Sequence, residues 1–169
     1  FDLLIEAFAQ LAPRFADWGL AILGEGRLHG ALEALVADRQ LSGRVLLPGA
    51  IASPGATLKK ADLFVLSSRW EALPMALIEA MACARPVGAT QCMGRAEPWI
   101  RPDENLVLTP ADDVPRLAAA MAGLMEDEAR RRQLGARAAR SVESFDLERI
   151  VATWEEMLRT PSYSPHPPR

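Results

Sequence analysis

The sequence has little cysteine, no long apolar run and no excess of positive charge, and each shortage excludes a class of protein. Its two cysteines, Cys83 and Cys92, form neither a disulfide framework nor the ligand spacing of a zinc site. No apolar run approaches the roughly 20 residues of a membrane-spanning helix, and no basic segment followed by an apolar one marks a signal peptide. The formal charge of −3 is spread over both signs, which argues against a nucleic-acid partner.

What is present is a chain of 169 residues that is 50% hydrophobic and 24% charged, as expected for one globular domain. The chain opens at Phe1 inside a helical pattern, so we expect it to be a fragment of a longer parent protein. Residues 161–169, "PSYSPHPPR", are proline-rich, which predicts a disordered tail after a folded domain of residues 1–160.

Short apolar runs alternate with helical patterns over the first 110 residues. Strands are expected within "WGLAILGEG", "RVLLPGA", "DLFVLSS", "RPVGAT" and "NLVLTP", and helices within "FDLLIEAFAQLA", residues 28–39, "GATLKKA", "MALIEAMACA" and residues 95–100. The first strand is a continuous apolar run, which predicts burial on both of its faces. The alternation predicts an α/β fold, a Rossmann-like parallel sheet flanked by helices.

The last third of the chain is expected to be helical. Apolar residues recur at helical spacing over residues 112–126 (Val114, Leu117, Met121, Leu124) and 145–158 (Leu147, Ile150, Val151, Trp154, Leu158). Between these segments, acids precede arginines by four positions, which predicts the pairs Glu126–Arg130, Asp127–Arg131 and Glu128–Arg132 on a solvated helix face.

Ligands of open parallel sheets bind beyond the carboxyl ends of the strands, and the glycines of "GEGR" stand at such a place. Gly24 and Gly26 would let a phosphate or a sugar approach the backbone closely. An ordinary strand-to-helix turn explains these two glycines equally well.

A second candidate loop is "SSRWEALPMALIEAMA", which carries Glu71 and Glu79 with seven residues between them. Pro74 suits the first position of a helix, so the helix should begin near Met75. Free N–H groups from Leu73 to Ala76 would face a diphosphate, with Glu79 in reach of a ribose and Glu71 near the sugar on the second phosphate. The alternative places both glutamates in solvent, but the helix is apolar all round, so we expect no freely solvated face.

Four segments of the chain, including the one that carries Glu71 and Glu79, together resemble a known enzyme family. The segments "ILGEG", "RVLLPGAI", "ADLFVLSSRWEALPMALIEAMACARPV" and "FDLERIVATWEEML" are similar to the C-terminal half of glycosyltransferase family 4, two-domain GT-B enzymes that use nucleotide-diphosphate sugars. The resemblance implies that Glu71 is the catalytic donor-sugar carboxylate and Glu79 the ribose carboxylate. It also implies a donor-sugar and diphosphate site of Gly24, Gly26, Ala72, Leu73, Pro74 and Met75, and a nucleobase loop at Pro48 and Gly49.

The activity implied is retaining transfer of a hexose or N-acetylhexosamine from a nucleotide-diphosphate sugar, expected to be a UDP-sugar. The acceptor would be a glycan or a lipid-linked sugar in surface polysaccharide synthesis, and the parent would be a cytoplasmic enzyme that can associate with the inner face of the membrane. No Asp-x-Asp pair occurs, so no metal or other cofactor is expected. Two alternatives stay open: a GT-B nucleotide-sugar epimerase, and a degenerate, non-catalytic nucleotide-binding module.

The chain also departs from the family. Ala72, Ala84 and Leu106 stand where the family usually has glycine, and an alanine at position 72 would be strained by roughly 1 kcal/mol if that position had a positive φ. The family's N-terminal domain, its first C-domain strand and a basic Arg and Lys pair would all precede Phe1. We therefore expect a gap in the sheet, or closure of the "AILG" and "LFVLS" strands onto each other, and a fragment that binds nucleotide weakly and transfers nothing.

Overall fold

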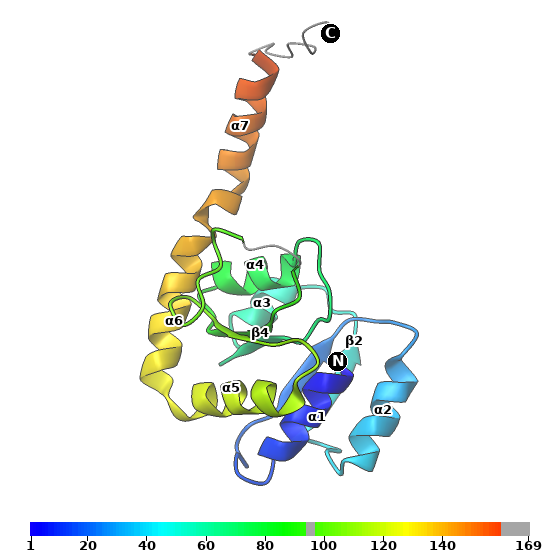
Figure 1. Cartoon of the computed structure of the whole chain (residues 1–169). Helices are drawn as coiled ribbons and strands as arrows, with labels where there is room; N and C mark the ends of the chain where they lie inside the picture. Colours follow the sequence, from blue (N-terminus) through cyan, green and yellow to red (C-terminus); the bar gives the residue numbers. More distant parts are fainter. Residues whose placement is uncertain (94–96, 160–169) are drawn as a thin grey trace, which may run out of the picture.

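The computed structural model describes residues 1–93 and 97–159, and it confirms an α/β fold of parallel strands flanked by helices (Figure 1). The strands are β1 (Leu20–Leu23), β2 (Val45–Gly49), β3 (Phe64–Leu66), β4 (Val87–Thr90) and β5 (Val107–Thr109). The helices are α1 (Asp2–Leu11), α2 (His29–Asp38), α3 (Pro54–Leu58), α4 (Met75–Ala82), α5 (Val114–Glu126), α6 (Glu128–Ser141) and α7 (Leu147–Arg159), with a 3-10 turn η1 (Glu143–Phe145).

Two of the expected segments lie wholly or partly outside the described residues. The tail from residue 161 is one of them, and so is the start of the helix expected over residues 95–100. The described part of that segment is a turn, in which the backbone N–H of Ile100 donates to the carbonyl of Glu97 at 2.9 Å.

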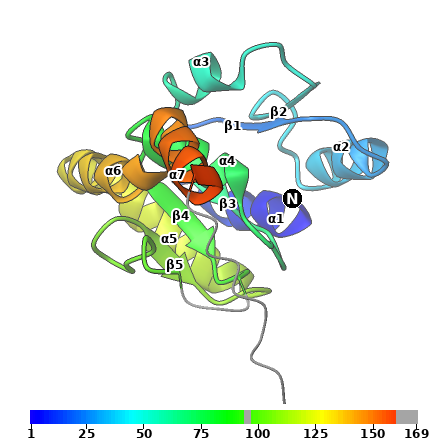
Figure 2. The same ribbon diagram turned by 90° about the horizontal axis from the view of Figure 1, so that it is seen from above.

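The strands form two sheets that do not pair with each other within the described residues. β1 pairs with β2, and β3, β4 and β5 pair in that order, all in parallel. Seen from above, the β1–β2 pair lies to one side of the other three strands (Figure 2). The expected gap is therefore present, and the strands that carry "AILG" and "LFVLS" do not close onto each other.

The prediction that β1 is buried on both faces is wrong. Ile22 is 5% exposed and belongs to the core, but its neighbour Ala21 is exposed. Successive side chains of a strand point to opposite faces, so Ile22 faces the core while Ala21 is on the other face and is exposed.

Two clusters of apolar side chains form the core, and α5 contributes to the packing of both sheets. One cluster joins α1, α2 and α5 to β1 and β2, and it contains the expected core residues Leu4, Phe8 and Leu11. The other joins α4 and α6 to β3 and β4. The methyl of Leu124 on α5 lies 3.7 Å from where a Cβ on Gly88 of β4 would stand, so α5 also packs against the second sheet. α4 and α5 lie on opposite sides of β4 (Figure 1).

The helix pattern breaks at Asp127, which ends α5 and caps α6. Its carboxylate accepts a hydrogen bond from the backbone N–H of Arg130 at 2.8 Å. Because spacing by four holds only within one helix, the predicted pairs Glu126–Arg130 and Asp127–Arg131 are wrong, whereas Glu128–Arg132 is confirmed. Instead, Glu126 pairs with Arg14, Arg130 with Asp103, and Arg131 donates to the carbonyls of Leu124 and Met125.

α7 projects away from the rest of the domain (Figure 1). The helix itself was expected, but its apolar residues are uncovered: Leu147, Ile150, Val151, Trp154 and Leu158 are between 38% and 78% exposed. No side chain of α7 is buried in the described part of the chain.

α4 ends in a turn that normally contains glycine. Ala84 has a φ of 53°, its N–H donates to the carbonyl of Met81, and the next N–H, from Arg85, donates to Ala80. This is a Schellman motif, in which the left-handed residue is usually glycine. Ala72 and Leu106 do not have positive φ, so alanine strain falls on position 84 and not on position 72.

Candidate functional site

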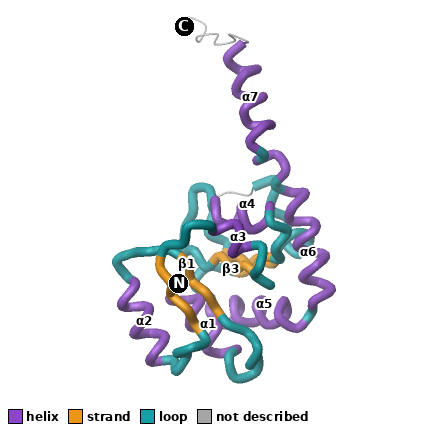
Figure 3. The backbone as a smooth tube through the Cα atoms, turned by 180° about the vertical axis from the view of Figure 1, so that it is seen from behind, coloured by secondary structure: helices purple, strands orange, loops and turns teal. Residues whose placement is uncertain are grey.

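β1 and β3 are edge strands of the two separate sheets (Figure 3). Residues of both strands line a cleft of ≈ 970 Å³. Its deep part is apolar and includes Phe8, Ile22 and Val65. Its other end is formed by residues that directly follow the strands, Gly24 after β1 and Ser67 and Ser68 after β3. The polar end therefore lies at the carboxyl ends of the strands, where ligands of such sheets bind.

Glu71 is half-buried and lines this polar end. Its carboxylate accepts a hydrogen bond from the hydroxyl of Ser68 at 2.7 Å, and its backbone N–H donates to the carbonyl of Cys92 at 2.9 Å. Burial, and then the negative charge of Glu71, raise the pKa of the Cys92 thiol. These contacts fix one carboxylate oxygen and leave the other available to a ligand.

The loop that carries Glu71 is tied to distant parts of the chain through Arg69. Two nitrogens of its guanidinium donate to the Asp2 carboxylate at 2.8 and 3.0 Å, and Nε donates to Asp112 at 2.7 Å. The hydrogen bonds from Arg69 hold the pKa of Asp2 well below its ordinary value. The loop is thus clamped to the start of α1 and to the turn before α5.

The N-terminus of α4 faces the same cleft. The helix begins at Met75 as expected, but Pro74 is its capping residue, with φ −78° and ψ 83°, and not its first helical residue. Within the described residues, the backbone N–H groups of Leu73, Met75 and Ala76 have no acceptor. Unpaired N–H groups and the helix dipole make this end favourable for an anion.

Glu79 lies one turn further along α4 and lines the cleft from an exposed position. The prediction that this helix has no solvated face is wrong, because Met75, Ala76 and Glu79 are all exposed. The opposite side of α4, with Leu77 and Met81, packs into the core. The solvated side borders the cleft, so the charge of Glu79 needs no buried partner.

The cleft brings together three of the predicted site residues, Gly24, Glu71 and Glu79. Gly24 has a φ of 118°, and its N–H donates to the carbonyl of Gly49 at 2.8 Å. The other predicted positions do not line the cleft: Gly26, Pro48, Gly49, Ala72, Leu73, Pro74 and Met75. Pro48 and Gly49 are the last two residues of β2, and Gly26 lies in the loop after β1. Ala72, Leu73 and Pro74 directly precede α4, and Met75 is its first residue.

Sequence reasoning missed the residues that hold Glu71 in place. Ser68 reaches the carboxylate directly, and the buried Thr90 hydroxyl donates to the Ser68 carbonyl at 2.5 Å. The signal available was the run of polar residues that begins where β3 ends, "SSR". The role of Arg69 depends on partners far along the chain, which no local pattern shows.

Residues 1–93 and 97–159 contain neither a metal-binding cluster nor a membrane-spanning helix. No group of three or more His, Cys, Asp or Glu side chains is placed to hold a metal ion. None of the helices there has the length and apolar character needed to span a membrane.

Comparison with known proteins gives a family match and many relatives. The family model "Glycosyl transferases group 1" matches residues 1–141. The chain is 34% identical to the exopolysaccharide phosphotransferase SCO2592 of Streptomyces coelicolor over 92% of this chain and 17% of that protein. It is 31% identical to an N-acetylgalactosaminyltransferase of Campylobacter jejuni, named for an N-acetylgalactosamine-N,N'-diacetylbacillosaminyl-diphospho-undecaprenol, over 88% of this chain and 40% of that protein.

Among solved structures, a mutant of S. aureus TarM in complex with fondaparinux, alpha-GlcNAc-glycerol and UDP superposes with a TM-score of 0.84 at 25% identity. This match covers 94% of the present chain and 32% of TarM. The chain thus spans less than half the length of each of these three proteins.

Proposed function

The chain belongs to the glycosyl transferases group 1 family, and from this premise we propose that it is the C-terminal, donor-binding domain of a retaining GT-B glycosyltransferase of family 4. The donor is a UDP-sugar that supplies a hexose or N-acetylhexosamine, and the acceptor is a glycan or a lipid-linked sugar. The UDP bound to TarM and the diphospho-undecaprenol in the name of the Campylobacter relative support these two assignments. An N-terminal GT-B domain of the parent completes the enzyme.

The observation that carries this proposal is the arrangement of the polar end of the cleft. Glu71 and Glu79 stand on either side of the free N–H groups at the start of α4. We assign the diphosphate to these N–H groups, because an anion is stabilised there. Glu79 then accepts hydrogen bonds from the ribose hydroxyls, and Glu71, oriented by Ser68, contacts the donor sugar.

In the proposed reaction an acceptor hydroxyl oxygen bonds to the anomeric carbon as the bond from that carbon to the diphosphate oxygen breaks. The hydroxyl proton leaves with the diphosphate, whose developing charge the N-terminus of α4 stabilises. A basic Arg and Lys pair, which the family resemblance assigns to the upstream chain, adds to this stabilisation. The proposed mechanism uses no metal ion.

Ala72 does not oppose this function. The alternative of a degenerate binding module drew support from the alanine that replaces glycine beside Glu71. Because Ala72 does not have a positive φ, alanine fits the backbone there without strain. The geometry of the loop at Glu71 is therefore compatible with an active site.

We also propose that a strand from the upstream part of the parent fills the apolar part of the cleft. Both β1 and β3 border this part of the cleft, and neither edge is paired there. A strand added between them would join the two sheets through backbone hydrogen bonds. Hydrogen exchange tests this: the amides of β1 and β3 should gain protection in a longer form of the protein, and equal exchange in both forms would contradict the idea.

Calorimetry with UDP tests the assignment of Glu79. Loss of one or two charge-assisted hydrogen bonds should weaken UDP binding by about 10- to 100-fold in Glu79→Ala. Glu33→Ala serves as the matched control, because Glu33 is an exposed helical glutamate outside the cleft. Equal affinity in wild type and Glu79→Ala would show that the ribose binds elsewhere.

Activity of the parent protein tests Glu71. Glu71→Gln should abolish sugar transfer while UDP still binds, since the change is at the donor sugar and not at the nucleotide. Interconversion of two nucleotide sugars without any acceptor would instead identify an epimerase. UDP binding with no turnover in the wild-type parent would identify a non-catalytic module.

A further inference from the structure

A second pocket, of ≈ 520 Å³, lies on a different part of the molecule and shares no lining residue with the cleft. It is formed by the 98–105 segment, the end of α6, η1 and the beginning of α7. Four arginines line it, Arg101, Arg137, Arg140 and Arg149, against two glutamates, Glu104 and Glu143. We call it the arginine pocket. Its surplus of positive charge contrasts with the net charge of −3 of the chain.

The arginine pocket lacks close counter-charges. The guanidinium groups of Arg137 and Arg140 have no hydrogen-bond or ion-pair partner within residues 1–93 and 97–159, although the two arginines stand three positions apart on one helix. The glutamate contacts of Arg101 and Arg149 are each 3.9 Å long. By comparison, the Arg39–Glu6 pair closes to 2.8 Å. Like charges at this helical spacing repel, and a bound anion would remove the repulsion.

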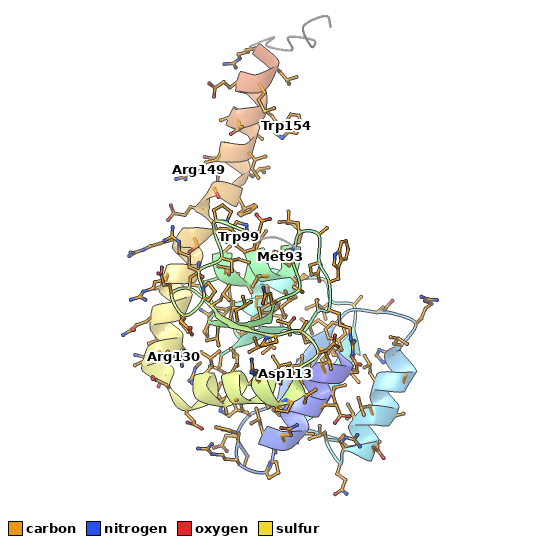
Figure 4. The ribbon with its side chains drawn as sticks, in the orientation of Figure 1. Met93, Trp99, Asp113, Arg130, Arg149 and Trp154 are labelled. Atoms are coloured by element: carbon orange, nitrogen blue, oxygen red, sulfur yellow. The ribbon has the colours of Figure 1, made fainter. Side chains whose placement is uncertain are left out.

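The wall of the pocket is preformed. Asn105 is 1% exposed, and its side chain accepts from the N–H of Arg101 at 2.9 Å and donates to the carbonyl of Trp99 and the hydroxyl of Ser141. These bonds join the 98–105 segment to α6. Trp99 lines the pocket and packs edge-on against Phe145, with ring centroids 5.5 Å apart. Figure 4 shows Trp99 and Arg149 at the junction between the body and α7.

We propose that the arginine pocket binds a sugar that carries a phosphate or a carboxylate group. Guanidinium groups pair with both oxyanions through two parallel hydrogen bonds, and Arg137 and Arg140 are free to do so. The volume exceeds what a single inorganic ion needs and falls in the range of small-molecule sites. The apolar face of a sugar ring packs on the indole of Trp99. This site is separate from the proposed donor site.

Titrations with glucose 1-phosphate, glucuronate and uncharged glucose, followed by calorimetry and tryptophan fluorescence, test the proposal. We expect saturable binding of at least one charged sugar and none of glucose, and the pair of charged probes distinguishes phosphate from carboxylate. The double variant Arg137→Ala/Arg140→Ala should weaken that binding by at least 10-fold. UDP affinity should not change, which separates this result from the fate of the donor site.

The matched control is Arg116→Ala/Arg132→Ala, which removes the same charge from exposed arginines outside the pocket. This control should leave the binding of the charged sugar within about twofold. An equal loss in both double variants would reduce the effect to general electrostatics and overturn the proposal. Absence of saturable binding to the wild-type chain, or binding of glucose as tight as that of the charged sugars, would overturn it as well.

Discussion

Replacing Ala84 with glycine should stabilise the protein, although it removes a methyl group. Ala84 sits at the left-handed position of the Schellman motif that ends α4, with a φ of 53°. A left-handed conformation costs a residue with a Cβ about 1–2 kcal/mol, and glycine avoids this cost. Glycine also gives the unfolded chain more conformational freedom, which lowers the free energy of unfolding by about 0.4–1 kcal/mol and offsets part of this gain. The expected net gain in the free energy of unfolding is therefore about 0.5–1 kcal/mol.

Urea denaturation followed by circular dichroism measures this gain, which corresponds to a rise in Tm of roughly 1–4 °C for a chain of this size. Two further variants sharpen the test. Gln40→Gly should also stabilise, because Gln40 has a φ of 55° at the end of α2 in the same hydrogen-bonding pattern. Ala72→Gly should destabilise by about 0.4–1 kcal/mol, because Ala72 does not have a positive φ and glycine only adds freedom to the unfolded chain.

The test lies in the sign of the change in the free energy of unfolding, which should be positive for Ala84→Gly and negative for Ala72→Gly. If Ala72→Gly stabilises the protein as much as Ala84→Gly does, the positive φ of Ala84 is not the source of the strain. In that case the strained alanine would be the one beside Glu71, and the geometry of the proposed donor site would have to be reconsidered.

Four other substitutions have definite expected outcomes. A Cβ at Gly135 would lie 2.2 Å from the Ala84 carbonyl oxygen, so Gly135→Ala should lower the free energy of unfolding by about 1–3 kcal/mol. A Cβ at Gly123 would have its nearest neighbour at 3.8 Å, so Gly123→Ala should raise the free energy of unfolding slightly. The pKa of Asp2 is lowered in the folded state, so its contribution to stability is complete at pH values above its unfolded pKa near 3.8 and is lost as the pH falls further. Asp2→Asn should therefore be slightly less stable than wild type at pH 7 and should lose less stability on acidification. Urea unfolding from pH 7 to pH 3 measures both effects. Asn105→Ala removes the hydrogen-bond partner of three groups around this buried side chain and should lower the free energy of unfolding by about 1–3 kcal/mol. An unchanged melting curve would contradict the role given to this side chain.

The sequence predicted the order of strands and helices because each is signalled locally. Apolar runs of four to six residues stand between helical patterns, and glycines or prolines mark many of the turns. The break at Asp127 was missed because no glycine or proline marks it, and only its carboxylate capping α6 shows it. Glu71 and Glu79 could be placed together because they lie in one segment that runs from a strand into a helix.

The clamp on the Glu71 loop could not be predicted in the same way. Arg69 and Asp2 are 67 positions apart, and Arg69 and Asp112 are 43 apart, so only the fold brings them together. The exposure of α7 has a similar cause. Its amphipathic pattern predicts a helix with a face to bury, but the pattern does not say which surface covers that face.

The position of α5 also affects how the domain should unfold. This helix contributes Leu117 and Met121 to one core and packs Leu124 against the sheet of the other, while the two sheets share no backbone hydrogen bonds in the described part of the chain. Cooperativity between the two halves must therefore pass through side-chain packing on one helix. Trp18 and Trp99 lie in different halves, and we expect their fluorescence to report a single transition while α5 is intact and two separate transitions once its packing is weakened.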